Sequence, residues 1–521
     1  MKRRSRSESP RPPRHQSVWA ATATLPTYPS LQENTSADVC IVGAGIAGVS
    51  TAYLLARAGK TVVVLDDGAL AGGMTQLTTA HLTNAIDDRY FEIERMHGEA
   101  RLRLAAQSHT ASIDRIEANV ANESVDCDFE RLDGYLFLPP GEDDELLDRE
   151  LASAHRAGLH EVEKLSRAPL DRFDTGPCLR FPGQAQFHPL KYVAGLAKAI
   201  ERDGGRIFTR SHVDRIDGGG PAQIKVGPHL VSADAVVVAT NTPINDRVRI
   251  HTKQAPYITY VIGARVPRGS VPRALFWDTQ QPYHYVRLQS LGAYDLLIVG
   301  GEDHKTGQAD DTEERHARLE GWSRERFPMM EEIEFVWGGQ VMETIDGLAF
   351  IGRNPMDDDN VLIVTGDSGQ GITHGTIASM ILTDLILGRE NPWASLYDPS
   401  RKTLGAAGEF AKEALNVAAQ YADWMTGGDV DSVDQIPRDS GAVVRRGLTK
   451  VAVYRDGQGT LHERSAVCTH LGCIVHWNPT AKTWDCPCHG SRYDKLGTVI
   501  NGPANKALAE VESEVPVSDN R

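Results

Sequence analysis

The sequence lacks a hydrophobic run long enough to cross a membrane. Its best candidate, residues 372–387, is interrupted by His374 and Asp384, whereas a transmembrane helix needs about 20 mostly apolar residues. The basic N-terminus also lacks the apolar core of a secretory signal, so the pair Arg3-Arg4 does not predict export. We therefore expect a cytoplasmic protein, with peripheral membrane association left open.

Positive charge is scarce. The chain has 55 Lys and Arg against 70 Asp and Glu, a formal net charge of −15, and six of the basic residues lie within residues 1–15. Nucleic-acid-binding proteins concentrate positive charge on one face or helix, so this balance argues against a nucleic acid as partner. The sequence favours a small-molecule substrate instead.

Cysteine is too rare for a disulfide scaffold. Only seven occur in 521 residues, a length that predicts roughly three or four domains. Four of the seven crowd into residues 468–488. In a chain expected to be cytoplasmic, such crowding favours metal or redox chemistry over a disulfide framework.

A glycine-rich turn near the N-terminus predicts a dinucleotide site. Residues 37–42 read as a buried strand, G-A-G-I-A-G (43–48) opens a helix, and residues 61–66 read as a second strand. In such a unit Gly43 allows the tight turn, Gly45 lets the backbone approach a pyrophosphate, and Gly48 allows close helix–strand packing. The helix N-terminus attracts the phosphates. A merely structural glycine turn is the alternative.

An acidic residue completes this unit. Asp66 ends the second strand and is the candidate for the ribose hydroxyls, with Asp67 as the fallback. The motif alone does not separate NAD from FAD.

Several further segments recur in the order typical of one superfamily. They are Gly72-Gly73 with T-T-A-H (78–81), F-H-P-L (187–190), Val213, A-D-A-V-V-V-A-T (233–240), D-G-L-A-F-I-G (346–352) and T-G-D-S-G-Q-G-I-T-H-G (365–375). Together with the glycine turn they resemble the D-amino-acid oxidase / glycine oxidase / sarcosine oxidase superfamily over about residues 37–395. The family more often has Glu where Asp66 stands.

This resemblance implies FAD as the cofactor and oxidation of a C–N bond in an amine or amino acid. It implies flavin-binding roles for Gly73, Thr79 and Val213, the last through its backbone at the adenine end. Gly366, Gly369, Gly371 and Ile372 would lie beside the pyrimidine edge, where a helix N-terminus would stabilise reduced flavin. Some relatives attach flavin through a histidine; for His81 we favour a noncovalent role.

The resemblance also indicates a substrate site. In the superfamily the substrate lies over the flavin beneath an antiparallel sheet, with its carboxylate held by arginine. Tyr283, Tyr285 and Arg287 alternate along one strand and would share a face. Arg287 suits a carboxylate, the tyrosines could wall the pocket, and His374 is a further catalytic candidate. His304 and Lys305 are weaker candidates for proton transfer.

The cysteine cluster contains two cysteine–histidine pairs. C-T-H-L-G-C (468–473) and C-P-C-H-G-S (486–491) supply Cys468, His470, Cys486 and His489 as metal ligands. Zinc can use two Cys and two His, and scattered disulfides are a further alternative. Both segments resemble a Rieske domain, in which two Cys bind one iron and two His the other.

Other residues of this region match high-potential Rieske proteins of cytochrome bc complexes. That resemblance implies a disulfide between Cys473 and Cys488, and hydroxyl groups of Ser491 and Tyr493 that donate hydrogen bonds to cluster sulfurs and raise the potential. Residues 502–504 resemble the loop that covers the cluster.

The expected fold class is an α/β FAD-binding Rossmann-like domain with an antiparallel-sheet substrate domain (α+β), plus a small all-β Rieske domain. We expect a disordered basic tail (1–36), the oxidoreductase (37–395), a helical linker (396–427) and the Rieske domain (428–521). Within the oxidoreductase the FAD-binding segments are about 37–95, 175–250 and 340–395, and the substrate-domain segments are about 96–174 and 251–339.

The combination predicts an FAD-dependent oxidoreductase acting on an amine or amino-acid-type substrate. Electrons would pass singly through the [2Fe-2S] cluster to an external acceptor. The alternatives are a 2-hydroxy-acid dehydrogenase of the same superfamily and a non-catalytic flavin/Rieske electron carrier or redox sensor. A Rieske oxygenase is disfavoured because no convincing 2-His-1-carboxylate iron site follows the cluster.

Overall fold

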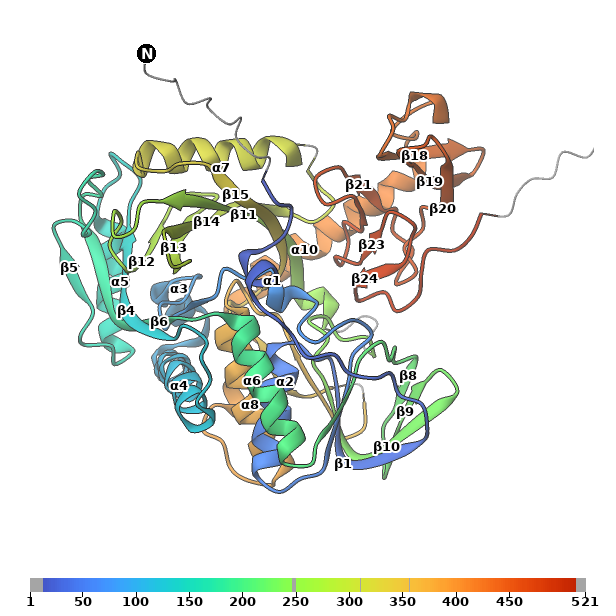
Figure 1. The fold of residues 1–521 in the computed structure, drawn as a ribbon, viewed down its shortest axis with the longest axis horizontal. Helices are drawn as coiled ribbons and strands as arrows, with labels where there is room; N and C mark the ends of the chain where they lie inside the picture. The colour runs from blue at the N-terminus through green and yellow to red at the C-terminus, as the bar shows by residue number, and fades with distance from the viewer. Residues whose placement is uncertain (1–12, 246–249, 310, 356, 512–521) are drawn as a thin grey trace, which may run out of the picture.

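The computed structural model of the protein describes residues 13–245, 250–309, 311–355 and 357–511. Two large sheets build the N-terminal part and two small sheets build the C-terminal part. Figure 1 shows the C-terminal part, in orange and red, beside the larger N-terminal part. Among the described residues, no helix has both the length and the apolar character needed to span a bilayer.

The first sheet is built from short runs of buried, mostly β-branched residues. Its spatial order is β16 (Phe350–Arg353), β17 (Val361–Thr365), β10 (His229–Val238), β1 (Thr35–Val42), β2 (Val62–Leu65) and β7 (Arg206–Phe208). β8 (Arg215–Asp217) and β9 (Ala222–Val226) extend it beside β10. The central strands run parallel, which requires crossover connections and leaves both faces covered.

Helices cover this sheet. α2 (Ile46–Arg57) packs against α6 (Pro189–Arg202) and α8 (Gly371–Ile386), and α4 (Glu99–Glu123) packs against α8. Figure 1 shows these helices side by side below the second sheet. The arrangement is the α/β dinucleotide-binding fold expected from the glycine turn and the buried strands.

The second sheet is mostly antiparallel. Its order is β15 (Ile333–Thr344), β11 (Gln254–Val266), β14 (Asp295–Lys305), β13 (His284–Ser290), β12 (Leu275–Asp278), β4 (Glu130–Phe137), β6 (Cys178–Gln186) and β3 (His81–Leu82), with β5 (Glu163–Leu165) on β6. β3 and β6 belong to segments that the sequence assigned to FAD binding, yet they pair within this sheet. The two domains therefore interleave more than the predicted boundaries state.

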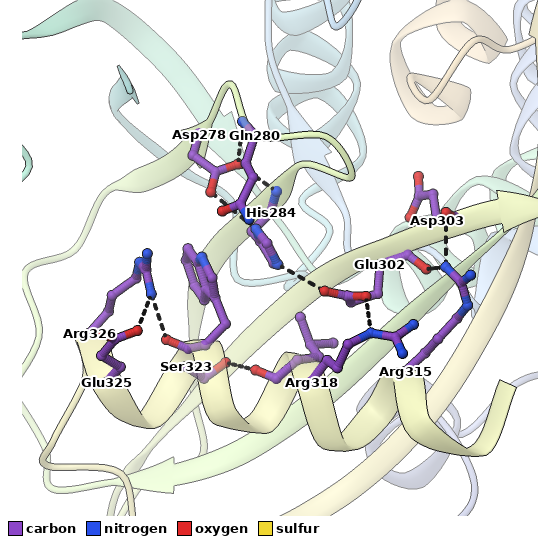
Figure 2. Close-up of polar contacts among 12 residues, drawn as sticks. Asp278, Gln280, His284, Glu302, Asp303, Arg315, Arg318, Ser323, Glu325 and Arg326 are labelled. Carbon is purple, nitrogen blue, oxygen red and sulfur yellow. Dashed lines mark hydrogen bonds and ion pairs between the residues drawn. The ribbon is translucent and has the colours of Figure 1, made fainter. Parts of the chain in front are cut away.

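One face of the second sheet is closed by α7 (Thr312–Arg326). Figure 2 shows a buried polar chain between them: His284 Nδ1 lies 3.0 Å from Asp278 Oδ2, and Glu302 accepts a hydrogen bond from Arg318 Nε at 2.8 Å. The His284 ring stacks on Trp322 at 4.3 Å. His284 therefore faces α7, and strand alternation turns its neighbour Tyr285 to the other side.

The N-terminal segment departs from its prediction. Residues 1–12 lie outside the described residues, but for residues 13–36 the predicted disorder is wrong. α1 (Val18–Thr22) buries Val18 and Trp19 completely, and Trp19 Nε1 donates a hydrogen bond to Thr78 O at 2.6 Å. The Arg, Ser and Pro content predicted disorder, but this short helix is stabilised by a contact with Thr78, which is distant in the sequence.

The remaining helices of the N-terminal part are α3 (Tyr90–His97) and α5 (Glu145–Arg156), and α9 (Ala394–Tyr397) begins the connection to the C-terminal part. α10 (Ala407–Gln420) and a 3₁₀ turn (Tyr421–Met425) complete that connection. The C-terminal part consists of a three-stranded and a four-stranded antiparallel sheet. They comprise β18 (Ser440–Arg446), β19 (Thr449–Arg455), β20 (Leu461–Ser465), and β21 (His476–Asn478), β22 (Thr483–Asp485), β23 (Arg492–Asp494), β24 (Val499–Asn501).

A buried ion pair ties this connection to the N-terminal part. Arg401 Nη2 and Nε contact the two carboxylate oxygens of Asp346 at 2.7 and 2.8 Å, with both side chains 2% exposed. Burial alone would raise the pKa of Asp346, but Arg401 outweighs it and lowers that pKa to about 2.

Replacing Asp346 with asparagine is expected to destabilise the fold by about 3 kcal/mol, because Arg401 is then left buried without its counter-charge. Denaturant unfolding measures the loss. Since the folded-state pKa lies below the ordinary value, the pair contributes fully above about pH 4 and loses its contribution as the pH falls towards 2. Asp359→Asn, at a side chain 96% exposed, is the control; an equal loss in both variants contradicts the argument.

Candidate functional site

A long cavity runs between the two sheets and reaches the C-terminal part. One end is lined by Asp66 and Asp67, and the other by Asp87, Tyr283 and Tyr285. Residues 499–502, 504 and 505 of the C-terminal part supply part of its wall. The cavity thus follows the path that the glycine turn predicts for a dinucleotide, from β2 towards the second sheet.

The glycine turn is built for close backbone approach. Gly43 has φ +108°, and a Cβ there would lie 2.3 Å from Ala239 O; a Cβ on Gly48 would lie 1.9 Å from Gly43 O. Gly45 is the N-cap of α2 and lines the cavity. These contacts fit the pyrophosphate of a dinucleotide lying on the helix N-terminus.

Asp66 lies where the sequence places it, at the end of β2. Its carboxylate accepts hydrogen bonds from Ala44 N at 2.6 Å and Gly68 N at 2.8 Å. Burial raises its pKa to about 6 despite these bonds. The fallback, Asp67, lies 3.5 Å from His212 Nδ1. Both carboxylates line the cavity, so the ribose end has two acidic groups available.

The other predicted FAD contacts also line the cavity. They are Gly73, Thr79, Val213, Gly366, Gly369, Gly371 and Ile372. Two features favour glycine at position 366. Its φ is +73°, and a Cβ there would lie 2.3 Å from Thr344 Cγ2. Gly371 begins α8, so the N-terminus of that helix is directed at this part of the cavity.

Two histidines of the cavity are neutral. Burial lowers the pKa of His81 and of His374 to about 3. His81 contacts Thr79 Oγ1 at 3.1 Å and Val286 O at 3.2 Å, so both ring nitrogens have partners within the protein, which favours the noncovalent alternative. His374 Nδ1 donates to Asp367 O at 2.8 Å.

Of the three predicted substrate-site residues, Tyr285 and Arg287 lie on β13 and Tyr283 directly precedes it, and they do not share one site. Tyr283 and Tyr285 line the cavity, but Arg287 is not among the lining residues. Its Nη1 donates to the carbonyls of Thr79, Ala80 and Phe187 at 2.8–3.2 Å. The expectation that Arg287 holds a substrate carboxylate is corrected, because its guanidinium serves backbone carbonyls instead.

His304 and Lys305 also lie away from the cavity lining. His304 contacts Tyr260 OH at 2.9 Å, and Lys305 pairs with Glu413 of α10. Neither is placed to exchange a proton with a substrate.

The cysteine–histidine cluster assembles on two neighbouring loops. Cys468 and Cys486 are buried free cysteines, and the rings of His470 and His489 lie 5.1 Å apart. A disulfide joins Cys473 to Cys488, as expected. Although the Sγ atoms of Cys473, Cys486 and Cys488 lie within 4.8 Å of one another, the disulfide leaves only Cys486 of these as a thiolate ligand.

Hydroxyl groups surround the cluster loops. Tyr493 OH lies 3.2 Å from Cys468 Sγ, and Ser491 Oγ accepts a hydrogen bond from Ala504 N at 3.0 Å. Two thiols and two imidazoles in this setting fit a [2Fe-2S] cluster with mixed ligands. The loop at residues 502–504 packs beside it, as its resemblance implied.

No sequence motif indicates the contact between this cluster and the N-terminal part. His251, 2% exposed, comes from the short 3₁₀ helix His251–Lys253 that precedes β11. Its ring lies 5.0 Å from that of His470 and 6.2 Å from that of His489. A residue of the N-terminal part therefore lies against both predicted histidine ligands.

Hydrogen bonds fix the same interface. Gln340 Nε2 donates to Gly490 O at 2.8 Å, Gln308 Nε2 to Pro487 O at 3.0 Å, and Asn505 Nδ2 to Val213 O at 2.9 Å. The last bond joins the C-terminal part to the residue predicted at the adenine end. No motif marks Gln308, Gln340 or Asn505, so only the folded arrangement reveals these contacts.

Comparison with known proteins agrees with this geometry. Residues 38–385 match the family described as FAD dependent oxidoreductase (DAO), and residues 427–512 match the Rieske [2Fe-2S] domain. A protein of Bacillus subtilis (strain 168) named as a Rieske 2Fe-2S iron-sulfur protein, YhfW, is 30% identical over 95% of this chain and 97% of its own length.

Two further relatives cover the oxidoreductase part. Gamma-glutamylputrescine oxidoreductase of Escherichia coli (strain K12) is 28% identical over 71% of this chain and 89% of its own. Glycine oxidase from Geobacillus kaustophilus shares the fold, with a TM-score of 0.60 and 18% identity over 70% of this chain and 99% of its own. The chain belongs to the FAD-dependent oxidoreductase (DAO) family, carries a C-terminal Rieske domain, and has FAD and a [2Fe-2S] cluster as its cofactors.

Proposed function

We propose that the protein oxidises an amine or amino-acid-type substrate and passes the electrons through the Rieske cluster to an external acceptor. The observation that carries the proposal is the position of His251, a residue of the oxidoreductase part, against the rings of both His470 and His489. An oxidase that delivers electrons directly to oxygen has no need of such a contact.

The cofactors supply two kinds of electron transfer: FAD accepts a hydride, and a Rieske cluster carries one electron at a time. The substrate loses hydride from the carbon bonded to nitrogen, and a C=N bond forms. Water then adds and the C–N bond breaks, which gives a carbonyl compound and an amine or ammonia. Each turnover sends two electrons singly to a one-electron acceptor and releases protons to solvent.

The residues proposed for these tasks are those that line the cavity and the cluster loops. The glycine turn and Asp66 hold the dinucleotide, and the turn at residues 366–372 holds the flavin. Tyr283 and Tyr285 wall the substrate chamber. Cys468, Cys486, His470 and His489 ligate the cluster, and Tyr493 donates a hydrogen bond to Cys468, which stabilises the reduced state.

Support for a C–N substrate comes from the relatives. The E. coli relative is named for gamma-glutamylputrescine, and similar folds include a protein titled L-proline dehydrogenase. From these names we propose for this chain only the class of substrate, an amine or an amino acid.

Anaerobic addition of amines, amino acids and 2-hydroxy acids, one at a time, tests the proposal. We expect an amine or amino acid to bleach the flavin absorbance, followed by the EPR signal of the reduced cluster. Bleaching by hydroxy acids alone would show a C–O dehydrogenase. A bleached flavin beside an oxidised cluster would contradict the relay, and no bleaching, with both centres reduced by dithionite, would favour an electron carrier.

A further inference from the structure

The substrate chamber lies at the end of the cavity beneath the second sheet. Thr259 of β11, Trp277 of β12 and the two tyrosines Tyr283 and Tyr285 line it from the sheet, and Asp87 lines it from the loop after β3. Asp87 adjoins the turn predicted to hold the flavin, since a Cβ on Gly369 would lie 2.2 Å from Asp87 Oδ2. Its carboxylate is therefore within the space where flavin and substrate meet.

The carboxylate of Asp87 lines the chamber, and no lysine or arginine among the described residues lines it with Asp87. Within the described ranges, the cavity lining includes four aspartates and neither Lys nor Arg. The positive charge of Arg89 lowers the pKa of Asp87, but Arg89 does not line the cavity, and its guanidinium donates to the backbone carbonyls of Asp87 and Asp278. A substrate carboxylate would meet no opposite charge here, because Arg287 serves backbone carbonyls.

Further carboxyl groups lie behind the lining. Asp303 of β14 lies beside Thr259, and Figure 2 shows its carboxylate on the side of the strand away from α7. Asp303 Oδ1 is buried and has no hydrogen-bond partner in the described part of the chain. Arg315 donates to the backbone carbonyl of Asp303 at 3.1 Å, which leaves that carboxylate oxygen as an acceptor without a donor.

The carboxyl groups repel one another. Burial raises the pKa of Asp87 to about 6 and that of Asp303 to about 7, and the charge of Asp87 adds to the rise at Asp303. Asp87 therefore remains mostly ionised at neutral pH. A bound cation relieves this repulsion, whereas a bound anion increases it.

Aromatic rings complete the chamber. The rings of Tyr283 and Tyr285 lie 5.4 Å apart at 37°, and Tyr283 OH donates to Asp87 Oδ2 at 3.2 Å. Faces of aromatic rings attract cations, and a carboxylate beside such rings is a common setting for ammonium recognition. The charge of Asp87 and the ring faces thus agree on one kind of ligand.

We infer that the substrate is a cationic amine that carries no carboxylate beside its reacting carbon, and that Asp87 binds its ammonium group beside the rings of Tyr283 and Tyr285. Where this group is the reacting nitrogen, it loses a proton before the hydride leaves, because the C=N bond needs the nitrogen lone pair. The inference rests on the proposed function, of which it names the substrate class. It separates this chain from relatives that hold an amino-acid carboxylate with arginine.

Binding to the oxidised holoenzyme tests the inference with two probes of similar shape and opposite charge. Tetramethylammonium and 2,2-dimethylpropanoate are added separately, and the change in flavin absorbance gives each dissociation constant. We expect tetramethylammonium to bind at least tenfold more tightly. Equal binding, or tighter binding of the anion, overturns the inference without any variant.

The variant Asp87→Asn tests whether the carboxylate of Asp87 is the group that binds the cation. It is expected to weaken tetramethylammonium binding at least tenfold while the FAD content and the cluster EPR signal stay unchanged; unaltered binding overturns the assignment to Asp87. Asp359→Asn, the same change at an exposed side chain, is the matched control.

Anaerobic reduction separates this inference from the proposed function. Faster flavin bleaching by 1,4-diaminobutane than by glycine or N-methylglycine supports both. Faster bleaching by the amino acids leaves the proposed function intact and overturns the cationic substrate. Bleaching by none of them, with tight tetramethylammonium binding, supports the cation site and contradicts the oxidation.

Discussion

Replacing Cys486 with alanine is expected to leave flavin reduction by the substrate intact and to abolish electron delivery to a one-electron acceptor. Cys486 is a buried free cysteine beside the disulfide, and without its thiolate one iron loses a ligand. Loss of an outer partner of a ligand already weakens metal binding by about 10–100-fold, so loss of a ligand should remove the cluster. Acceptor reduction should fall by more than about 100-fold.

The measurement combines anaerobic flavin bleaching, cluster EPR and steady-state reduction of an artificial one-electron acceptor. Cys178→Ala is the control, because Cys178 is likewise free and buried but lies on β6, outside the cluster loops. Full acceptor reduction in Cys486→Ala would show that electrons leave the flavin directly, and the cluster would then have another task.

The parts of the site that the sequence predicted are those formed by residues close together in the chain. The motif of the glycine turn needs only residues 43–48 and the strand before them, although the atom that a Cβ on Gly43 would meet belongs to Ala239, far away in the chain. Each cluster pair lies within four consecutive residues. Local motifs of this kind specify their chemistry whatever the rest of the fold does.

The parts that sequence reasoning missed depend on contacts across the fold. Trp19 is buried only because Thr78 and Arg287 lie beside it, and composition alone suggested a disordered tail. Arg287 was expected in the cavity because it alternates with Tyr285, but three carbonyls from two distant segments hold its guanidinium. Strand alternation predicts which face of the sheet a side chain lies on, but it does not predict which atoms that side chain contacts.

His251 illustrates the same limit for function. Nothing in H-T-K (251–253) is a motif, yet the fold brings this histidine to both predicted histidine ligands. The order of domains along the chain predicts that electrons pass from flavin to cluster. Gln340 and Asn505 form hydrogen bonds across the interface, and it is the fold that brings the cluster loops and the oxidoreductase part together.

Replacing Gly43 with alanine is expected to weaken FAD binding at least about 100-fold. A non-glycine residue at positive φ costs about 1–2 kcal/mol, roughly a tenfold loss of affinity or slightly more. The new Cβ would also lie 2.3 Å from Ala239 O, a backbone atom of the residue that follows β10. The turn must move away from β10, and its N–H groups then no longer meet the pyrophosphate.

FAD retained after gel filtration, and FAD titration of the apoprotein, measure this loss. Gly59→Ala is the matched control: Gly59 also has positive φ, +84°, but a Cβ there would meet no atom within 4 Å. It should lose some stability and keep its FAD. The EPR signal of the cluster reports whether the Gly43 variant is folded, because the Rieske ligands lie outside the turn. A folded Gly43→Ala protein with full FAD affinity would mean that the turn does not hold the cofactor, since backbone strain and a backbone clash cannot both be absorbed without moving the N–H groups.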